Sequence, residues 1–132
     1  MKPDKKLYED QGKVWNEAAK HLQSLLSGHA FVKEAHVWAS LAEGRFGIYK
    51  SPFKGEKASD IDLVVVVKEP FKLPKEWKFT GVQKSWFDLY RLGHFDYEGN
   101  RHRIDGLVVI PSRHDLGKMR EALKGRSKQL RV

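Results

Sequence analysis

The chain has 132 residues, of which 40% are hydrophobic, and its formal net charge is +8. This length and hydrophobic content allow one compact core, so we expect a single domain over 1–132. The absence of cysteine excludes disulfides, thiolate zinc sites and cysteine nucleophiles. The longest apolar run is too short to cross a bilayer and the charged first residues do not resemble a signal peptide, so we expect a cytoplasmic protein without membrane contact.

The first part of the chain is predicted to form a long helix, a short strand and a loop. Apolar residues recur at helical spacing over 5–27. A strand over 35–39 follows, and Ser40 is predicted to cap a short helix within 40–46. Residues 47–59 carry glycine, proline and three lysines, a composition that predicts a loop.

The next strand, over 60–68, begins with two aspartates one residue apart. Side chains alternate along a strand, so Asp60 and Asp62 are expected to point the same way, about 6.5–7 Å apart. Two such anions repel each other and resist desolvation, and a divalent cation would relieve both effects. The pattern therefore predicts a metal site, although an aspartate before a strand also commonly caps a turn.

The second part of the chain is predicted to contain a hairpin and a final helix. Residues 69–78, with two prolines, are expected to be a connector. Strand-like segments over 86–97 and 102–110 are separated by a turn. Ser112 is predicted to cap the last helix. These elements predict an α/β (α+β) fold, a mixed β-sheet with helices packed on it.

The final helix and tail, residues 112–132, are strongly basic. From Arg113 to the end there are seven basic residues against two acidic ones. Such a segment suits a polyanion such as RNA, DNA or the phosphates of a nucleotide. A solvated helix followed by a frayed terminus explains the same composition equally well.

A third aspartate, Asp105, lies at the start of another apolar stretch, Ile-Asp-Gly-Leu-Val-Val. If this strand lies beside the strand that begins at Asp60, Asp105 joins Asp60 and Asp62 on one face. Three carboxylates at neighbouring strand ends suit two divalent ions that clamp the attacking and leaving oxygens of a phosphoryl transfer. The glycine after Asp105 would permit close approach by a substrate or a neighbouring strand.

Taken together, Ser-Leu-Ala-Glu-Gly-Arg-Phe at 40–46, Ser-Asp-Ile-Asp-Leu at 59–63 and Ile-Asp-Gly-Leu at 104–107 resemble motifs of the DNA polymerase beta-like nucleotidyltransferase superfamily. The chain looks most like its small stand-alone members, the minimal nucleotidyltransferases. The resemblance covers roughly residues 30–110. It implies a nucleotidyltransferase-like fold and Mg²⁺-dependent transfer of a nucleoside monophosphate from an NTP to a hydroxyl.

The resemblance also implies roles for individual residues. Asp60 and Asp62 would hold two Mg²⁺ ions, and Asp105 would complete the site and help deprotonate the attacking hydroxyl. Ser40 and the amides after it would hold the triphosphate at a helix N-terminus. Arg45 would be a further phosphate ligand.

Two departures from the family pattern keep an alternative function open. Ala39 stands where the family has glycine, and nineteen residues separate Ser40 from Asp60. The alternative is a catalytically weak or inactive module of the same fold. Such a module would bind nucleic acid through the basic C-terminal segment, or a small helical partner protein in the manner of an antitoxin.

Overall fold

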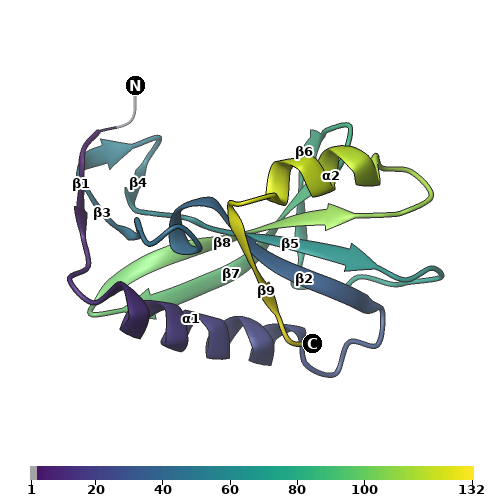
Figure 1. Cartoon of the computed structure of the whole chain (residues 1–132), viewed down its shortest axis with the longest axis horizontal. Helices are drawn as coiled ribbons and strands as arrows, with labels where there is room; N and C mark the ends of the chain where they lie inside the picture. Colours follow the sequence, from purple (N-terminus) through teal and green to yellow (C-terminus); the bar gives the residue numbers. More distant parts are fainter. Residues whose placement is uncertain (1–2) are drawn as a thin grey trace.

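The computed structural model describes residues 3–132 as a six-stranded mixed sheet with one helix on each face and a separate three-stranded sheet at one end (Figure 1). The fold is α+β, as predicted. The elements are β1 (Lys5–Leu7), α1 (Gln11–Leu26), β2 (Val32–Trp38), the 3₁₀ turn η1 (Ala39–Leu41), β3 (Gly47–Phe53), β4 (Glu56–Ala58), β5 (Ile61–Val67), β6 (Lys78–Gln83), β7 (Asp88–Tyr97), β8 (Asn100–Val109), α2 (Leu116–Leu123) and β9 (Ser127–Leu130).

The large sheet has the strand order β6-β7-β8-β5-β2-β9. Strands β5 and β8 are parallel, and the other neighbouring pairs in this sheet are antiparallel. Ile61 pairs with Ile104, and Asp62 pairs with Asp105. The two acidic strand starts are therefore direct neighbours, which is the condition under which Asp105 joins the other aspartates on one face.

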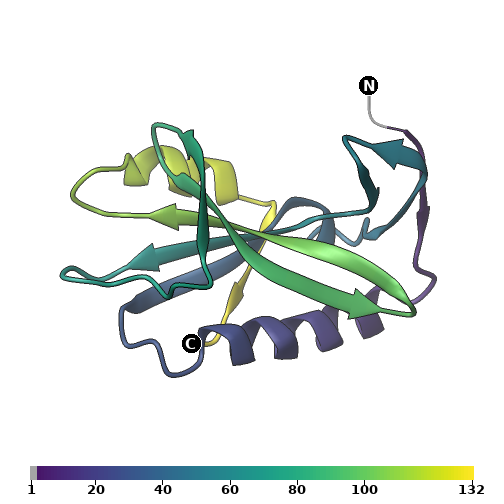
Figure 2. The same cartoon turned by 180° about the vertical axis from the view of Figure 1, so that it is seen from behind.

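The two faces of the large sheet carry separate apolar clusters, and β5 contributes to both. Leu63 and Val65 pack with α1 on one face, whereas Val64 and Val66 pack with α2 on the other. This is the alternation expected for a strand buried on both sides. Figure 2, seen from behind, shows α1 running along the opposite side of the sheet from α2. Asp62 shares the α2 face with Val64, because residues two apart point the same way.

The first helix begins later than its apolar spacing predicts. Helix α1 starts at Gln11, where the Asp10 carboxylate accepts a hydrogen bond from the Lys13 amide at 2.9 Å. The preceding residues form β1, which pairs with β3. Leu7, which matched the helical spacing, is 43% exposed on that strand. Strand β2, by contrast, begins at Val32, three residues before the predicted start at residue 35.

The loop predicted over 47–59 is wrong, because this segment forms the β3–β4 hairpin. Lys54 and Gly55 both have positive φ at its tip, which suits a tight hairpin turn. Strand β1 packs so closely on Gly47 that a Cβ there would lie 2.2 Å from the Lys6 carbonyl oxygen. The short helix predicted within 40–46 is only the three-residue turn η1, and Ser40 lies inside it rather than capping it.

The β7–β8 hairpin agrees with the prediction, with its turn at Glu98 and Gly99. Strand β6 begins within the predicted connector. Helix α2 is capped by Asp115, not Ser112: its carboxylate accepts a hydrogen bond from the Lys118 amide at 3.0 Å. The tail forms β9, an edge strand that pairs with β2, so it is not frayed.

Candidate functional site

The candidate site lies where β5 and β8 begin, on the α2 face of the large sheet. Asp62 and Asp105 are cross-strand neighbours, and parallel neighbours point to the same face. Helix α2 packs farther along these strands, over Val64 and Leu107, and leaves the aspartate end uncovered by the helix. Asp105 is nevertheless 7% exposed, so its carboxylate is largely shielded from water.

Arg103, two residues before Asp105, ties the acidic groups together. Its guanidinium donates to Asp105 Oδ1 at 3.0 Å, to Asp60 Oδ2 at 2.9 Å and to Glu56 Oε1 at 2.9 Å. Burial opposes the charge of Arg103, but the hydrogen bond and negative charge of Asp105 outweigh it, so the pKa of Arg103 is raised. Sequence reasoning missed this residue, although the Arg-x-Asp spacing places both side chains on one face.

Among residues 3–132, no group of three or more histidine or carboxylate side chains lies in a metal-binding arrangement. Instead, the Arg103 guanidinium lies among Asp60, Asp105 and Glu56 and forms an ion pair with each of them. The donor set itself fits Mg²⁺, which prefers carboxylate oxygens. The structure thus places an internal cation where the sequence predicts metal ions.

A pocket of about 500 Å³ opens beside these carboxylates. Five of the six residues singled out from the sequence line it: Ala39, Ser40, Arg45, Asp60 and Asp62. Asp105 is not part of the lining. It is connected to the site as the cross-strand neighbour of Asp62 and as a hydrogen-bond acceptor of Arg103. The pocket is completed by residues that sequence reasoning did not identify: Pro3, Asp4, Lys5, Tyr49 and Arg126.

The turn at Ala39 forms one wall of this pocket. Ala39 has φ +64°, a left-handed conformation that favours glycine. Its carbonyl accepts from the Glu43 amide and the Ser40 carbonyl accepts from the Arg45 amide, each at 2.9 Å. These two amides are therefore used within the turn. The sequence predicts a phosphate site at a helix N-terminus, but η1 is a single three-residue turn and does not supply the dipole of a longer helix.

Two arginines flank the turn and share one carboxylate. Arg45 donates to Glu43 at 2.9 Å, and Arg126 donates to the same carboxylate at 3.3 Å. The hydrogen bonds from Arg126 and then Arg45 lower the pKa of Glu43. Arg126 also lies over the Trp38 ring, 5.5 Å from its centroid, and its carbonyl accepts from the Ala39 amide. No local sequence signal marks Arg126, because the fold of α2 and β9 brings it here.

Tyr49, on β3, brings an aromatic side chain to the carboxylates. Burial raises the pKa of its hydroxyl, and the charges of Asp60 and Asp62 raise it further. The phenol therefore stays in its neutral form. The segment predicted to be a surface loop thus supplies a wall of the candidate site.

A buried histidine fixes the backbone just before the acidic strand. His102 Nδ1 lies 2.7 Å from the Ser59 carbonyl, so this nitrogen carries the proton, and Nε2 accepts from the Tyr8 hydroxyl at 2.7 Å. Burial lowers the pKa of His102 and keeps the ring neutral. The ring therefore anchors the residue that precedes Asp60, and neither nitrogen is available to a metal.

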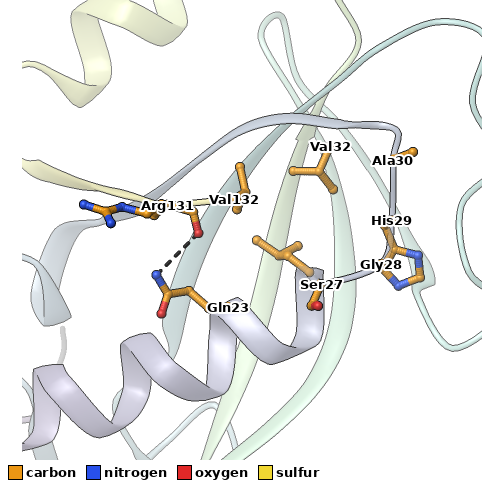
Figure 3. Close-up of a pocket in the computed structure, with 9 residues that line it drawn as sticks. Gln23, Ser27, Gly28, His29, Ala30, Val32, Arg131 and Val132 are labelled. Atoms are coloured by element: carbon orange, nitrogen blue, oxygen red, sulfur yellow. Dashed lines mark hydrogen bonds between the residues drawn. The ribbon is translucent and has the colours of Figure 1, made fainter.

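A second pocket, of about 520 Å³, lies at the C-terminal end of α1. Figure 3 shows Gln23 donating to the Arg131 carbonyl across it, at 3.4 Å. Its lining contains no carboxylate side chain and none of the residues singled out from the sequence. It is therefore separate in position and chemistry from the site at the start of β5.

Comparison with known proteins gives no match: no family model, curated protein or solved structure is similar to this chain. Within residues 3–132, neither helix combines the length and the apolar character needed to span a bilayer. The function of the site is therefore inferred from its geometry.

Proposed function

We propose that this protein is a Mg²⁺-dependent nucleotidyltransferase that transfers a nucleoside monophosphate from an NTP to a hydroxyl and releases pyrophosphate. The observation that carries the proposal is the pairing of Asp62 with Asp105 beside a pocket that contains Asp60 and Ser40. The order of elements around this pairing also supports the resemblance to the nucleotidyltransferase superfamily. Strand β2, which ends at Trp38 directly before Ala39 and Ser40, lies next to the Asp-x-Asp strand β5, and the third aspartate lies on β8, on the other side of β5.

In this proposal Asp60, Asp62 and Asp105 hold the Mg²⁺ ions. Bound Mg²⁺ would neutralise charge on the transferred phosphoryl group and stabilise the attacking and leaving oxygens. Asp105 accepts the proton of the attacking hydroxyl at its carboxylate. Arg103 positions Asp60 and Asp105, and its charge allows these carboxylates to stay close together.

The cations of the pocket bind the triphosphate. Lys5, Arg45 and Arg126 all line it, so three cations lie in the same pocket as Asp60 and Asp62. Two of these cations, Arg45 and Arg126, are held by Glu43, which keeps both guanidinium groups at the mouth of the turn. Charge-assisted hydrogen bonds from guanidinium groups suit phosphate oxygens.

The test is Asp62→Asn, measured by titrating the protein with NTP in the presence and absence of Mg²⁺ in a calorimeter. We expect Mg²⁺-dependent NTP binding to be lost while the fold stays intact or becomes slightly more stable, because one of two neighbouring carboxylates becomes neutral. Asp96→Asn is the matched control, since Asp96 is an exposed aspartate in the same sheet that pairs with Arg101. Equal NTP binding by wild type and Asp62→Asn would refute the proposal.

The alternative, a nucleic-acid module that binds through the basic C-terminal segment, is less well supported by the contacts. Two of its arginines are already engaged: Arg113 with Asp88 and Arg120 with Glu34. The segment also contains α2 and β9, which belong to the core and to the sheet. Deleting residues 113–132 would therefore disrupt the fold, and point substitutions are required instead.

A further inference from the structure

A row of cross-strand neighbours leads away from the candidate site toward the β6 edge of the large sheet. Asp62 pairs with Asp105, Asp105 pairs with Arg91 on β7, and Arg91 pairs with Lys78 on β6. Directly paired residues in a sheet point to the same face. The row therefore runs over the α2 face, from two carboxylates to two cations.

Arg91 and Lys78 are both exposed. Among residues 3–132 neither takes part in an ion pair, whereas Arg101, on the neighbouring strand β8, is paired with Asp96. Like charges directly opposite each other on a sheet destabilise it. An anion that lies between Arg91 and Lys78 would remove this repulsion.

The spacing of the row suits a chain of anions connected to the acceptor hydroxyl. Neighbouring strands lie about 4.8 Å apart, so the backbone at Arg91 is roughly 10 Å from Asp62 and that at Lys78 roughly 15 Å. If the hydroxyl at the end of such a chain lies at Asp62 and Asp105, the chain that follows it would cross Arg91 first and Lys78 next. A chain with a phosphate at each step contacts these cations while its end stays at the aspartates, which an isolated phosphate cannot do.

The surroundings favour a single strand over a duplex. The small sheet reaches this face, because Glu56 of β4 bonds to Arg103 and Tyr49 of β3 lines the same pocket as Asp62. Helix α2 packs on the same face at the other end of β5 (Figure 1). The Asp105 side chain is only 10% exposed between them, so a narrow, flexible end reaches it more readily than a paired end.

We propose that the acceptor is a single-stranded nucleic acid that crosses β7 and β6 over Arg91 and Lys78, with its terminal hydroxyl at Asp62 and Asp105. The role as acceptor rests on the proposed nucleotidyl transfer. The binding surface itself rests on the cation pair and its register with the aspartates.

The experiment compares wild type with the double variant Lys78→Gln, Arg91→Gln. Binding of a fluorescein-labelled oligoribonucleotide of about ten nucleotides is followed by anisotropy over a range of salt concentrations. Two phosphate contacts on a single strand contribute about 1.4 to the slope of log K against log salt, about 0.7 each. We expect the variant to bind more weakly and to have a slope shallower by about this amount.

The matched control is Lys13→Gln, Lys20→Gln, which removes the same charge from exposed positions on α1, across the sheet. It is expected to keep the wild-type slope. Equal weakening in both double variants would overturn the inference, because the effect would then come from net charge alone. Thermal unfolding checks that each variant is folded.

Calorimetry with Mg²⁺ and NTP separates this inference from the proposed function. Wild type that binds NTP but not the oligonucleotide would overturn the nucleic-acid acceptor alone and leave nucleotidyl transfer standing. Wild type that binds the oligonucleotide through Arg91 and Lys78 but does not bind NTP would refute the proposed function and retain the surface. NTP affinity equal in wild type and the Lys78, Arg91 variant is the result expected when both proposals hold.

Discussion

Ala39→Gly tests whether the pocket turn is strained at the position where the sequence departs from the family pattern. Ala39 has φ +64°, and a left-handed conformation costs an L-residue about 1–2 kcal/mol. Glycine removes this cost but adds unfolded-state entropy worth about 0.5–1 kcal/mol. We therefore expect the substitution to raise the free energy of unfolding by about 0.5–1 kcal/mol, although glycine usually destabilises.

Ala42→Gly is the internal control, because Ala42 lies three residues later in the same turn with φ −67° and ψ −29°. With no strain to relieve, glycine there should lower the free energy of unfolding by about 0.5–1 kcal/mol. Urea denaturation of both variants measures the difference, which should be about 1–2 kcal/mol. If Ala39→Gly destabilises the protein as much as Ala42→Gly does, the argument from strain is refuted.

Contacts elsewhere in the sheet give three further expected outcomes. A hydrogen bond from Arg120 lowers the pKa of Glu34 to about 2, so this pair stabilises the protein above pH 4.5 and is lost as the pH falls toward 2. Glu34→Gln should lower the free energy of unfolding by about 1–2 kcal/mol at pH 7. The free energy of unfolding of this variant should also fall less steeply between about pH 5 and 2. Urea denaturation at each pH measures this, and an acid decline as steep as that of wild type would contradict the expectation. Gly106→Ala would place a Cβ 2.6 Å from Leu92 Cδ1 and should destabilise by about 1–3 kcal/mol, so an unaltered melting temperature would show that the contact is not tight. Arg103→Met leaves its three carboxylate partners without their countercharge and should cost about 2–3 kcal/mol. Millimolar Mg²⁺ should then raise the melting temperature of Arg103→Met more than that of wild type, and equal shifts would argue against a metal at these carboxylates.

The strands that build the site were predictable because their patterns are local. Side chains alternate along β5, so Asp62 shares a face with Val64 and Leu63 points to the other face. The structure agrees, because Leu63 and Val64 belong to the apolar clusters on opposite faces of the sheet. The β7–β8 hairpin follows from two apolar runs around a turn at Glu98 and Gly99. The pairing of β5 with β8 remained conditional at the level of sequence, since nothing in one strand specifies its neighbour.

The small sheet was missed because its stability depends on contacts between distant segments. Residues 47–59 have the composition of a loop, and β3 becomes a strand by pairing with β1, about forty residues earlier. The Lys54-Gly55 turn was a usable hairpin signal, since glycine accepts the positive φ that such turns require. Leu7 was assigned to the helix because a single apolar residue fits a period of 3.6 as easily as a period of 2.

Of the residues missed at the site, Arg103 was within reach of sequence reasoning and Arg126 was not. Arg103 lies two residues from Asp105 on a predicted strand, so both had to share a face. Arg126 reaches the pocket only because α2 packs on the sheet and β9 pairs with β2. The basic segment that was predicted to bind a polyanion thus adds one residue, Arg126, to the lining of the pocket.

If the proposed function holds, the position of Arg103 would link metal binding to nucleotide binding. Because Arg103 already bonds to Asp60 and Asp105, a Mg²⁺ ion alone would replace an existing cation and gain little electrostatic energy. An NTP would add negative charge beside Arg45 and Arg126 in the pocket, and its phosphate oxygens would be further ligands of the kind that Mg²⁺ prefers. Under the proposed function, the metal would therefore bind more favourably together with the nucleotide than alone.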